Sequence, residues 1–438
     1  MSRRPRRFIG TIVSKTPPVC GTRWYRRPVP PLSELSIDEQ LRVLTAGTVQ
    51  CIDADELASK LATGRPLRVK LGIDPTASDI HLGHTVVLHK LRQFQDLGHL
   101  AVLIIGDFTA RVGDPTGRSA TRPPLTAADV EGHARTYVEQ VKAVLDFSPG
   151  KIELVHNADW LARMDMADIL RLTGRTTVAR IMERDDFSNR FRDGVPIALS
   201  ELLYPLLQGT DSVEVRADVE LGGTDQLFNN LMGRQLQSVA GMEPQVVMTL
   251  PLLAGLDGVK KMSKSLGNYV GISEPAAEQF GKLMSIPDPL MPRYFALVTG
   301  WHPDRVTETV AALADGSLSP VDAKRLLGRT VADLYHGKGA GAAAEAEFDR
   351  VFKAHEVPTE VPDRCVAASE FPLRLARLLA LVELVPSNKE GRRKIEQGGV
   401  RLAGEKVTDP DVEVDAQTVD GLLLQVGKRA WARVIVES

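Results

Sequence analysis

Two histidines and two lysines are the side chains of this sequence best suited to chemistry on a phosphate. His81 and His84 stand in a tetrapeptide HLGH, and Lys261 and Lys264 stand in a pentapeptide KMSKS much further along the chain. When a carboxylate attacks the α-phosphate of ATP, negative charge builds on the transferring phosphoryl group and on departing pyrophosphate, so preplaced cations and N–H donors lower the barrier. Together the motifs predict ATP-dependent activation of an amino acid.

The segment around the histidines predicts a strand, a turn and a helix. Residues 67–71 are expected to form a buried strand, and Asp79 is expected to cap a helix whose first turn carries both histidines. At a helix start the free N–H groups and the macrodipole favour bound phosphate, and Gly83 lets a nucleotide approach closely. The apolar residues at helical spacing are Leu82, Val86, Val87, Leu91 and Phe94.

Each motif also has a simpler interpretation. The histidines are compatible with an ordinary surface position, and KMSKS is compatible with a solvated basic loop. The presence of both motifs in this order favours the catalytic hypothesis over either of these interpretations.

Three segments between the motifs carry polar residues suited to binding a small substrate. Tyr204, Gln208 and Asp211 follow one another at spacings of four and three residues, which places them on one helical face. Asp114 lies in a GDPT segment, and residues 222–226 read GGTDQ, whose glycines allow close backbone approach. Taken singly, Asp114 is also compatible with a turn and Asp211 with a charge at a helix end.

On these residues the chain, from residue 32 to its C-terminus, resembles the class I aminoacyl-tRNA synthetases and in particular the tyrosyl-tRNA synthetases. The resemblance implies a tyrosine–tRNA ligase that forms tyrosyl-adenylate from L-tyrosine and Mg²⁺-ATP and transfers tyrosine to the 3′ end of tRNA(Tyr). His81 and His84 would stabilise the transition state, and Lys261 and Lys264 would stabilise the pyrophosphate. A homodimer through the catalytic domain is also implied.

The same resemblance assigns the tyrosine site. Tyr204, Gln208 and Asp114 would bind the ammonium group, Asp211 would meet the phenol, and Gln226 would bind the carboxylate.

The resemblance also assigns the ATP site. Asp74 and Thr76 would line the nucleotide and the nascent adenylate, while Gly223 and Asp225 would contact the ribose. Gly83, the two histidines and the two lysines complete the expected ATP-binding set.

Two residues depart from the pattern that the resemblance predicts. Lys70 occupies a position where many members carry a phenol-binding tyrosine, and Thr210 replaces a tyrosine beside the pocket aspartate. Thr109 lies near Asp114 and belongs to the expected tyrosine site. These departures leave open a paralogue that activates a modified tyrosine, since selection of a hydroxyl depends on satisfying buried polar groups.

Composition restricts the class of protein. The chain has 438 residues, 43% hydrophobic residues and a net charge of −2, so any RNA contact must use local basic patches. Three cysteines without a CxxC pair argue against a disulfide framework or a zinc site, so we expect a cytoplasmic enzyme without a bound metal. No apolar run reaches the length of a membrane span, and no GxGxxG or P-loop pattern is present.

Short apolar runs predict the sheet of the catalytic domain. Residues 67–71, 102–106, 152–155 and 245–250 are expected as strands, with helical stretches between them. This alternation predicts an α/β fold with a Rossmann-like parallel sheet, whose ligand crevice lies at the carboxyl ends of the strands.

The whole chain divides into five predicted segments. Residues 1–31 are a basic disordered extension, 32–273 the catalytic domain, 274–353 a helical domain, 354–370 a linker and 371–438 a small α+β domain. The last segment resembles the S4 RNA-binding domain, whose basic helix would neutralise phosphates. Its expected RNA-binding residues are Lys389, Arg392, Arg393 and Lys394. An RNA-binding protein that has lost catalysis is therefore a second open alternative.

Overall fold

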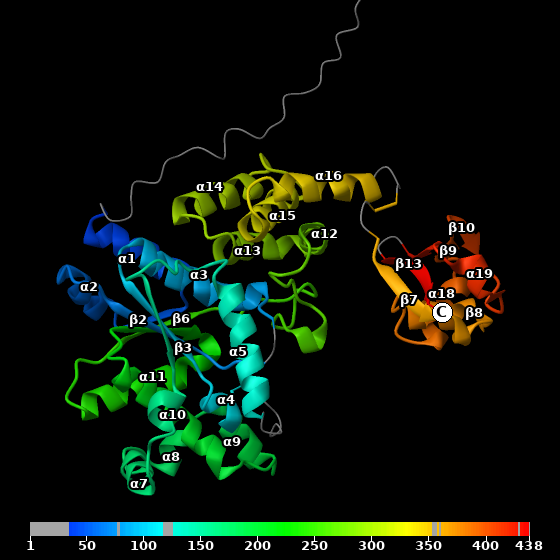
Figure 1. Ribbon diagram of the computed structural model, residues 1–438. Coiled ribbons are helices and arrows are strands. Elements are labelled where there is room, and N and C mark those ends of the chain that lie inside the picture. The colour runs from blue at the N-terminus through cyan, green and yellow to red at the C-terminus, as the bar shows by residue number, and fades with distance from the viewer. Residues whose placement is uncertain are drawn as a thin grey trace, which may run out of the picture.

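A computed structural model describes residues 35–76, 79–116, 126–352, 357–358, 361–427 and 430–437. The basic extension predicted for residues 1–31 lies outside this part of the chain. Figure 1 shows the chain passing from an α/β unit through a group of helices to a small C-terminal unit. None of the helices in the described ranges combines the length and apolar character needed to cross a membrane.

The first unit is built on a six-stranded sheet with the order β1-β6-β5-β2-β3-β4. Five strands run parallel, which confirms the predicted parallel sheet. These strands are β2 (Arg68–Ile73), β3 (Leu100–Ile105), β4 (Ile152–His156), β5 (Val219–Gly223) and β6 (Val246–Leu250). The sixth strand, β1 (Gln50–Ile52), pairs antiparallel with β6 at the edge.

The strand β3 separates two hydrophobic cores, because successive side chains of a strand point to opposite faces. Ala101 and Leu103 pack into the large core that includes helix α3 (Leu82–Asp96). Val102 and Ile104 pack on the other face. All four side chains are fully buried, so the sheet is covered on both sides, as an α/β fold requires.

The remaining helices of this unit flank the sheet and form its connections (Figure 1). Helix α10 contains Pro205 and packs along α11. Their bounds are α1 (Ile37–Thr45), α2 (Ala54–Ala62), α4 (Thr109–Val112), α5 (Ala127–Val141), α6 (Ala158–Leu161), α7 (Met166–Thr173), α8 (Val178–Ile181), α9 (Asp185–Arg192), α10 (Leu199–Glu214) and α11 (Leu227–Val239).

The middle unit is helical, as predicted. Helix α16 approaches α15 so closely that a Cβ on Gly341 would lie 2.3 Å from the carbonyl oxygen of Arg329, which explains a glycine inside a helix. The helices are α12 (Ala276–Met284), α13 (Met291–Val298), α14 (Pro303–Ala314), α15 (Pro320–His336) and α16 (Ala340–Phe352).

The C-terminal unit is α+β with its own hydrophobic core. Its five-stranded sheet has the order β10-β9-β12-β13-β7. Leu373–Arg374 form a short strand, β8, which pairs with β11 and directly precedes the helix α17. The other elements are β7 (Asp363–Ala367), α17 (Leu375–Leu381), α18 (Asn388–Glu396), β9 (Val400–Leu402), β10 (Glu405–Val407), β11 (Glu413–Val414), α19 (Ala416–Val419), β12 (Leu423–Val426) and β13 (Ala430–Glu437).

Candidate active site

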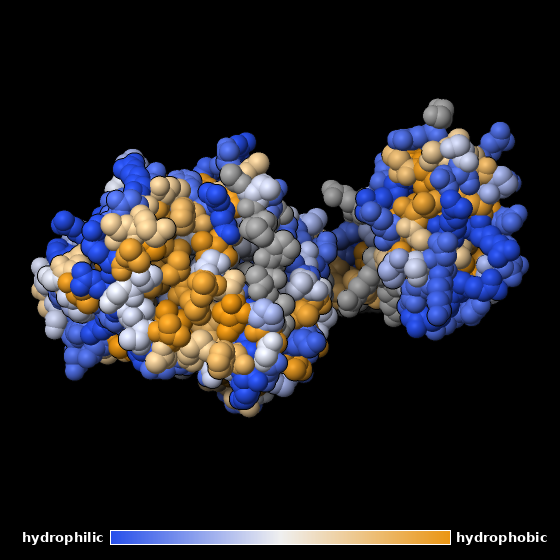
Figure 2. Space-filling view, turned by 90° about the horizontal axis from the view of Figure 1, so that it is seen from below, coloured by the Kyte–Doolittle hydropathy of each residue, from blue (hydrophilic) through white to orange (hydrophobic). Residues whose placement is uncertain are grey.

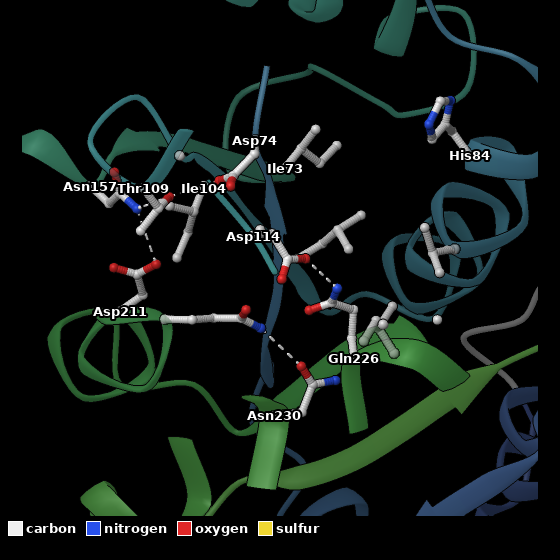
Figure 3. A pocket seen from close by; sticks show the side chains of 18 of the residues that line it. Ile73, Asp74, His84, Ile104, Thr109, Asp114, Asn157, Asp211, Gln226 and Asn230 are labelled. Atoms are coloured by element: carbon white, nitrogen blue, oxygen red, sulfur yellow. Dashed lines mark hydrogen bonds between the residues drawn. The ribbon is translucent and has the colours of Figure 1, made fainter. Parts of the chain in front are cut away.

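A pocket of about 280 Å³ opens where the parallel strands end, at the edge of the sheet where the sequence places the ligand. Figure 3 shows side chains from β2, β3, α10 and the segment after β5 converging on it. The predicted residues that line it are Asp74, Thr76, His84, Thr109, Asp114, Tyr204, Gln208, Asp211, Gly223 and Gln226. Six predicted residues are not among its described lining residues: Lys70, His81, Gly83, Asp225, Lys261 and Lys264.

Asp74 is a hydrogen-bonded centre at the end of β2. Its carboxylate accepts hydrogen bonds from Thr109 Oγ1 at 2.7 Å and from the Tyr204 hydroxyl at 2.8 Å. Burial raises the pKa of Asp74 to about 7, and these two hydrogen bonds oppose that rise. Thr109 and Tyr204, predicted to bind tyrosine, thus hold Asp74, predicted to bind the nucleotide. The two predicted sites are therefore continuous.

Asp211, on α10, is held by two residues that sequence reasoning missed. Trp160 Nε1 donates to Asp211 Oδ1 at 2.8 Å, and Asn157 Nδ2 donates to Asp211 Oδ2 at 3.3 Å and to Thr109 Oγ1 at 2.9 Å. Burial raises the pKa of Asp211 to about 7, while the charge on Lys70 and the two hydrogen bonds oppose the rise. Asn157 directly follows β4. Its position at the carboxyl end of a predicted strand could have identified it as a candidate pocket residue.

Asp114 and Gln226 meet across the pocket. Gln226 Nε2 donates to Asp114 Oδ2 at 2.7 Å, and Gln226 Oε1 accepts from Asn229 Nδ2 at 3.0 Å. Asp114 Oδ1 also accepts from the backbone N–H of Thr116 at 2.9 Å. Both side chains are therefore fixed before any substrate arrives.

Gln208 borders the same pocket beside a third residue that sequence reasoning missed, Asn230. Gln208 Nε2 lies 3.1 Å from Asn230 Oδ1 and 3.3 Å from Glu220 Oε1. Glu220 is buried beneath the pocket, where it pairs with Lys70 at 2.8 Å. The structure thus places Lys70 behind the pocket wall and not on its surface.

The HLGH segment begins α3, but Asp79 does not cap that helix, so this part of the prediction is wrong. His81 is the N-cap, and its Nδ1 accepts from the backbone N–H of Gly83 at 3.1 Å. The Asp79 carboxylate instead pairs with the Lys264 ammonium, which removes it from the helix start.

The two histidine rings stack with their centroids 3.8 Å apart. Burial lowers the pKa of His81 to about 3 and that of His84 to about 4, and nearby Lys264 adds to both shifts. The imidazoles are therefore neutral at neutral pH and can act on a phosphate as hydrogen-bond donors, not as cations.

The KMSKS motif and the residues that follow it lie against the start of α3. Leu82 N donates to Val270 O at 2.9 Å, His81 forms a β-bridge with Gly271, and Met262 is buried in the main core. Lys261 Nζ lies 3.9 Å from Asp225 Oδ2. The fold therefore brings together the two motifs that the sequence predicts to share a site, with both lysines next to carboxylates.

Comparison with known families agrees with this geometry. Residues 62–353 match the family model of the class I tRNA synthetases (W and Y), and residues 373–420 match the S4 domain. Because the first match covers more than half of the chain, the chain belongs to the class I tRNA synthetases.

Curated relatives narrow the class to its tyrosine branch. The chain is 51% identical to a tyrosine–tRNA ligase of Moorella thermoacetica over 405 residues, which cover 92% of this chain and 97% of the relative. It is 50% identical to a tyrosine–tRNA ligase of Geobacter sulfurreducens over 404 residues, which cover 91% of this chain and 99% of the relative. The chain is a member of the tyrosine–tRNA ligase family.

Solved structures support the fold. A truncated mitochondrial tyrosyl-tRNA synthetase of Aspergillus nidulans aligns with a TM-score of 0.61 at 21% identity, covering 72% of this chain and 94% of that one. A tyrosyl-tRNA synthetase of Archaeoglobus fulgidus complexed with L-tyrosine aligns with a TM-score of 0.59 at 22% identity, covering 71% and 99%. The class I α/β fold predicted from the sequence is thereby confirmed.

Proposed function

We propose that the pocket binds L-tyrosine and Mg²⁺-ATP, forms tyrosyl-adenylate, and presents it to the 3′ end of tRNA(Tyr). The observation that carries this proposal is the order of polar groups across the pocket (Figure 3): Asp211 lies at one end, His84 at the other, and Asp114 and Gln226 between them. Tyrosine presents its hydroxyl, ammonium and carboxylate groups in the same order, and the activated phosphate must lie beyond the carboxylate.

Each end of tyrosine meets groups of suitable chemistry. Asp211 accepts the hydrogen bond of the phenol, while Asp114, Tyr204 and Gln208 bind the ammonium group. Gln226, through its amide N–H, binds the carboxylate in exchange for its present contact with Asp114. Thr109 orients Asp74 and Asn157 and needs no direct contact with tyrosine.

The reaction itself needs no covalent enzyme intermediate. A carboxylate oxygen of tyrosine attacks the α-phosphorus of ATP, and the bond to pyrophosphate breaks. The neutral imidazoles of His81 and His84 donate hydrogen bonds to the transferring phosphoryl group, while Lys261 and Lys264 neutralise the leaving pyrophosphate. A ribose hydroxyl of the tRNA then attacks the carbonyl carbon, loses its proton and displaces AMP.

The nucleotide lies between β2 and the GGTDQ segment in this proposal. Asp74, Thr76 and Gly83 face it from the HLGH side, and Gly223 and Asp225 face its ribose. Mg²⁺ enters bound to the ATP phosphates, whose oxygens are the ligands that this ion prefers.

The decisive experiment is amino-acid-dependent ATP–pyrophosphate exchange, measured with all twenty amino acids and ring-modified tyrosines. We expect exchange confined to tyrosine, and a loss of about 100-fold or more in Lys264→Ala, the size typical for removal of one charge-stabilising group. Lys338→Ala is a matched control because Lys338 is an exposed lysine of the middle unit, away from the pocket.

The other outcomes separate the alternatives. Exchange only with a modified tyrosine would favour the paralogue that Lys70 and Thr210 leave open. Absence of exchange with every amino acid, together with retained RNA binding, would favour a non-catalytic RNA-binding protein.

The C-terminal unit is proposed to bind the tRNA through α18. Lys389, Arg392 and Arg393 are exposed on this helix, and Lys394 is half-buried. Arg392 pairs with Asp411 at 2.9 Å and Arg393 pairs with Glu390 at 2.6 Å, so RNA phosphates must compete with these carboxylates. Such contacts give an affinity that depends on salt concentration. Since its substrates are tRNA and ATP, we place the enzyme in the cytoplasm.

A homodimer through the catalytic unit is supported by an exposed apolar surface. Figure 2 views the molecule from the side on which α7, α8 and α9 lie in Figure 1 and shows hydrophobic side chains gathered there. Leu199 is 81% exposed and Phe191 is 74% exposed. Large exposed apolar patches mark protein interaction sites, and a second copy of this chain is the proposed occupant. Other exposed apolar residues of α7 and α8 are Met166, Leu170 and Val178.

Light scattering tests the dimer. The chain has a mass of 47.8 kDa, and we expect twice that mass in solution. Phe191→Asp combined with Leu199→Asp is expected to give the monomer mass, whereas Val321→Asp, at an exposed apolar residue of α15, is expected to leave the dimer intact. A monomeric wild-type chain would contradict the proposal.

A further inference from the structure

A lysine is completely buried directly behind the tyrosine pocket. Lys70 lies on β2, opposite Glu220 in the register of β2 and β5, and its side chain is 0% exposed. Its Nζ lies 2.8 Å from Glu220 Oε1. A buried charge is costly unless all of its polar contacts are satisfied, so the position needs an explanation.

The ammonium group of Lys70 is aimed at one turn of α10. It donates to the backbone carbonyl of Gln208 at 3.0 Å and to Ser212 Oγ at 2.7 Å, and with Glu220 these contacts use all three of its N–H bonds. Gln208 and Ser212 flank Asp211 on α10. The cation is therefore fixed immediately behind the residue that we assign to the substrate hydroxyl.

The charged groups around Asp211 oppose one another. Burial raises the pKa of Asp211 to about 7, Lys70 lowers it and Glu220 raises it. Asp74 at the end of β2 and Tyr204 on α10 also interact with the Asp211 charge. The balance matters because an ionised carboxylate can only accept hydrogen bonds, which selects a phenol over a bare ring.

We propose that Lys70 is a positioning residue for amino acid selection, whose buried ammonium keeps Asp211 ionised as an acceptor for the hydroxyl of tyrosine. Lys70 acts through α10 and does not touch the substrate. This inference rests on the proposed role of Asp211. It explains why lysine stands at position 70, where many family members carry tyrosine. The lysine would serve the selection of tyrosine and would not adapt the pocket to a different amino acid.

Two variants isolate the cation, because neither of them carries the Glu220 charge. Glu220→Gln keeps Lys70, whereas the double variant Lys70→Met with Glu220→Gln removes it and leaves no buried unpaired charge. The KM for tyrosine is measured in pyrophosphate exchange between pH 6 and pH 8.5, with the KM for ATP as an internal reference.

We expect the double variant to show a tyrosine KM severalfold higher than that of Glu220→Gln at pH 6, because a shift of about one pH unit in the titration of Asp211 changes its ionised fraction by up to about tenfold when the pH lies below the titration. The ratio should shrink as the pH rises to 8.5, and exchange with phenylalanine should rise relative to tyrosine at pH 7. A tyrosine KM that is equal in the two variants, or raised equally at every pH, would overturn the proposal.

A second comparison covers the case in which the double variant fails to fold. Glu220→Gln alone removes the anion that opposes Lys70, so its pH dependence should move to lower pH than that of the wild type; an unchanged or opposite movement refutes the role of Lys70. Asp211→Asn tests the assignment of Asp211 separately from the role of Lys70. If it leaves the tyrosine KM unchanged, the assignment of Asp211 fails, whereas a raised KM with no Lys70 effect refutes only the inference about Lys70.

Discussion

Adding one methyl group at Gly106 should disable the pocket without touching the substrate. Gly106 follows β3, and a Cβ at this position would lie 2.0 Å from Asp74 Oδ1 and 2.5 Å from Thr109 Oγ1. Neither distance is possible between unbonded atoms, so in Gly106→Ala the Asp74 carboxylate must move by about 1 Å or more to reach ordinary contact.

The size of the effect follows from the contacts that this movement breaks. Asp74 would lose the hydrogen bonds from Thr109 at 2.7 Å and from Tyr204 at 2.8 Å. A hydrogen bond to a charged group contributes about 1.5 kcal/mol or more, so the two together contribute about 3 kcal/mol. This corresponds to a loss of about 100-fold in kcat/KM for tyrosine.

The assay is tyrosine-dependent pyrophosphate exchange by Gly106→Ala beside two other variants. Gly132→Ala adds the same methyl group to α5, where nothing lies within 4 Å, and should leave kcat/KM unchanged. Thr109→Val removes one of the two hydrogen bonds to Asp74, keeps the Tyr204 hydroxyl, and should cost about tenfold. If Gly106→Ala loses no more activity than Thr109→Val, Asp74 is not held by both hydrogen bonds as proposed.

Three further predictions concern the phenol site, the histidines and the RNA surface. Trp160→Phe removes the 2.8 Å hydrogen bond to Asp211, so the tyrosine KM should rise about tenfold while the ATP KM stays constant in steady-state exchange. Four histidines should make stability depend on pH, because desolvation lowers their pKa values below the ordinary 6.5. Between about pH 6.5 and 4 only the unfolded chain binds these protons, so the free energy of unfolding should fall as the pH drops, as urea titrations can measure. Lys389→Gln with Arg393→Gln should weaken tRNA binding and reduce the slope of log affinity against log salt by about two units in filter binding. The histidines are His81, His84, His89 and His99.

The strands β3 and β6 could be predicted because each is an apolar run buried on both faces. The edge strand β1 was missed because its three residues, Gln50–Ile52, carry no apolar alternation and lie between two helices. Its pairing is decided by the exposed edge of β6, which no local pattern encodes.

Only some of the polar residues of the pocket could be predicted from the sequence. Asp114, Tyr204 and Asp211 stand in motifs, but Trp160 and Asn157 do not, because their role depends on where β4 ends relative to α10. The Asp79 cap was predicted wrongly for a similar reason. A local rule favours an aspartate at a helix start, whereas the pairing with Lys264 comes from a segment far along the chain.

The protonation of the histidines determines which part of the site supplies positive charge. Because His81 and His84 are neutral, the positive charge that the two motifs contribute lies on Lys261 and Lys264. Both lysines are next to carboxylates, Asp225 and Asp79, when no polyphosphate is bound. ATP must therefore replace these carboxylates as the partner of the lysines. Because these ion pairs are partly exposed to solvent, the exchange costs little, and the stronger charge of the leaving pyrophosphate favours it.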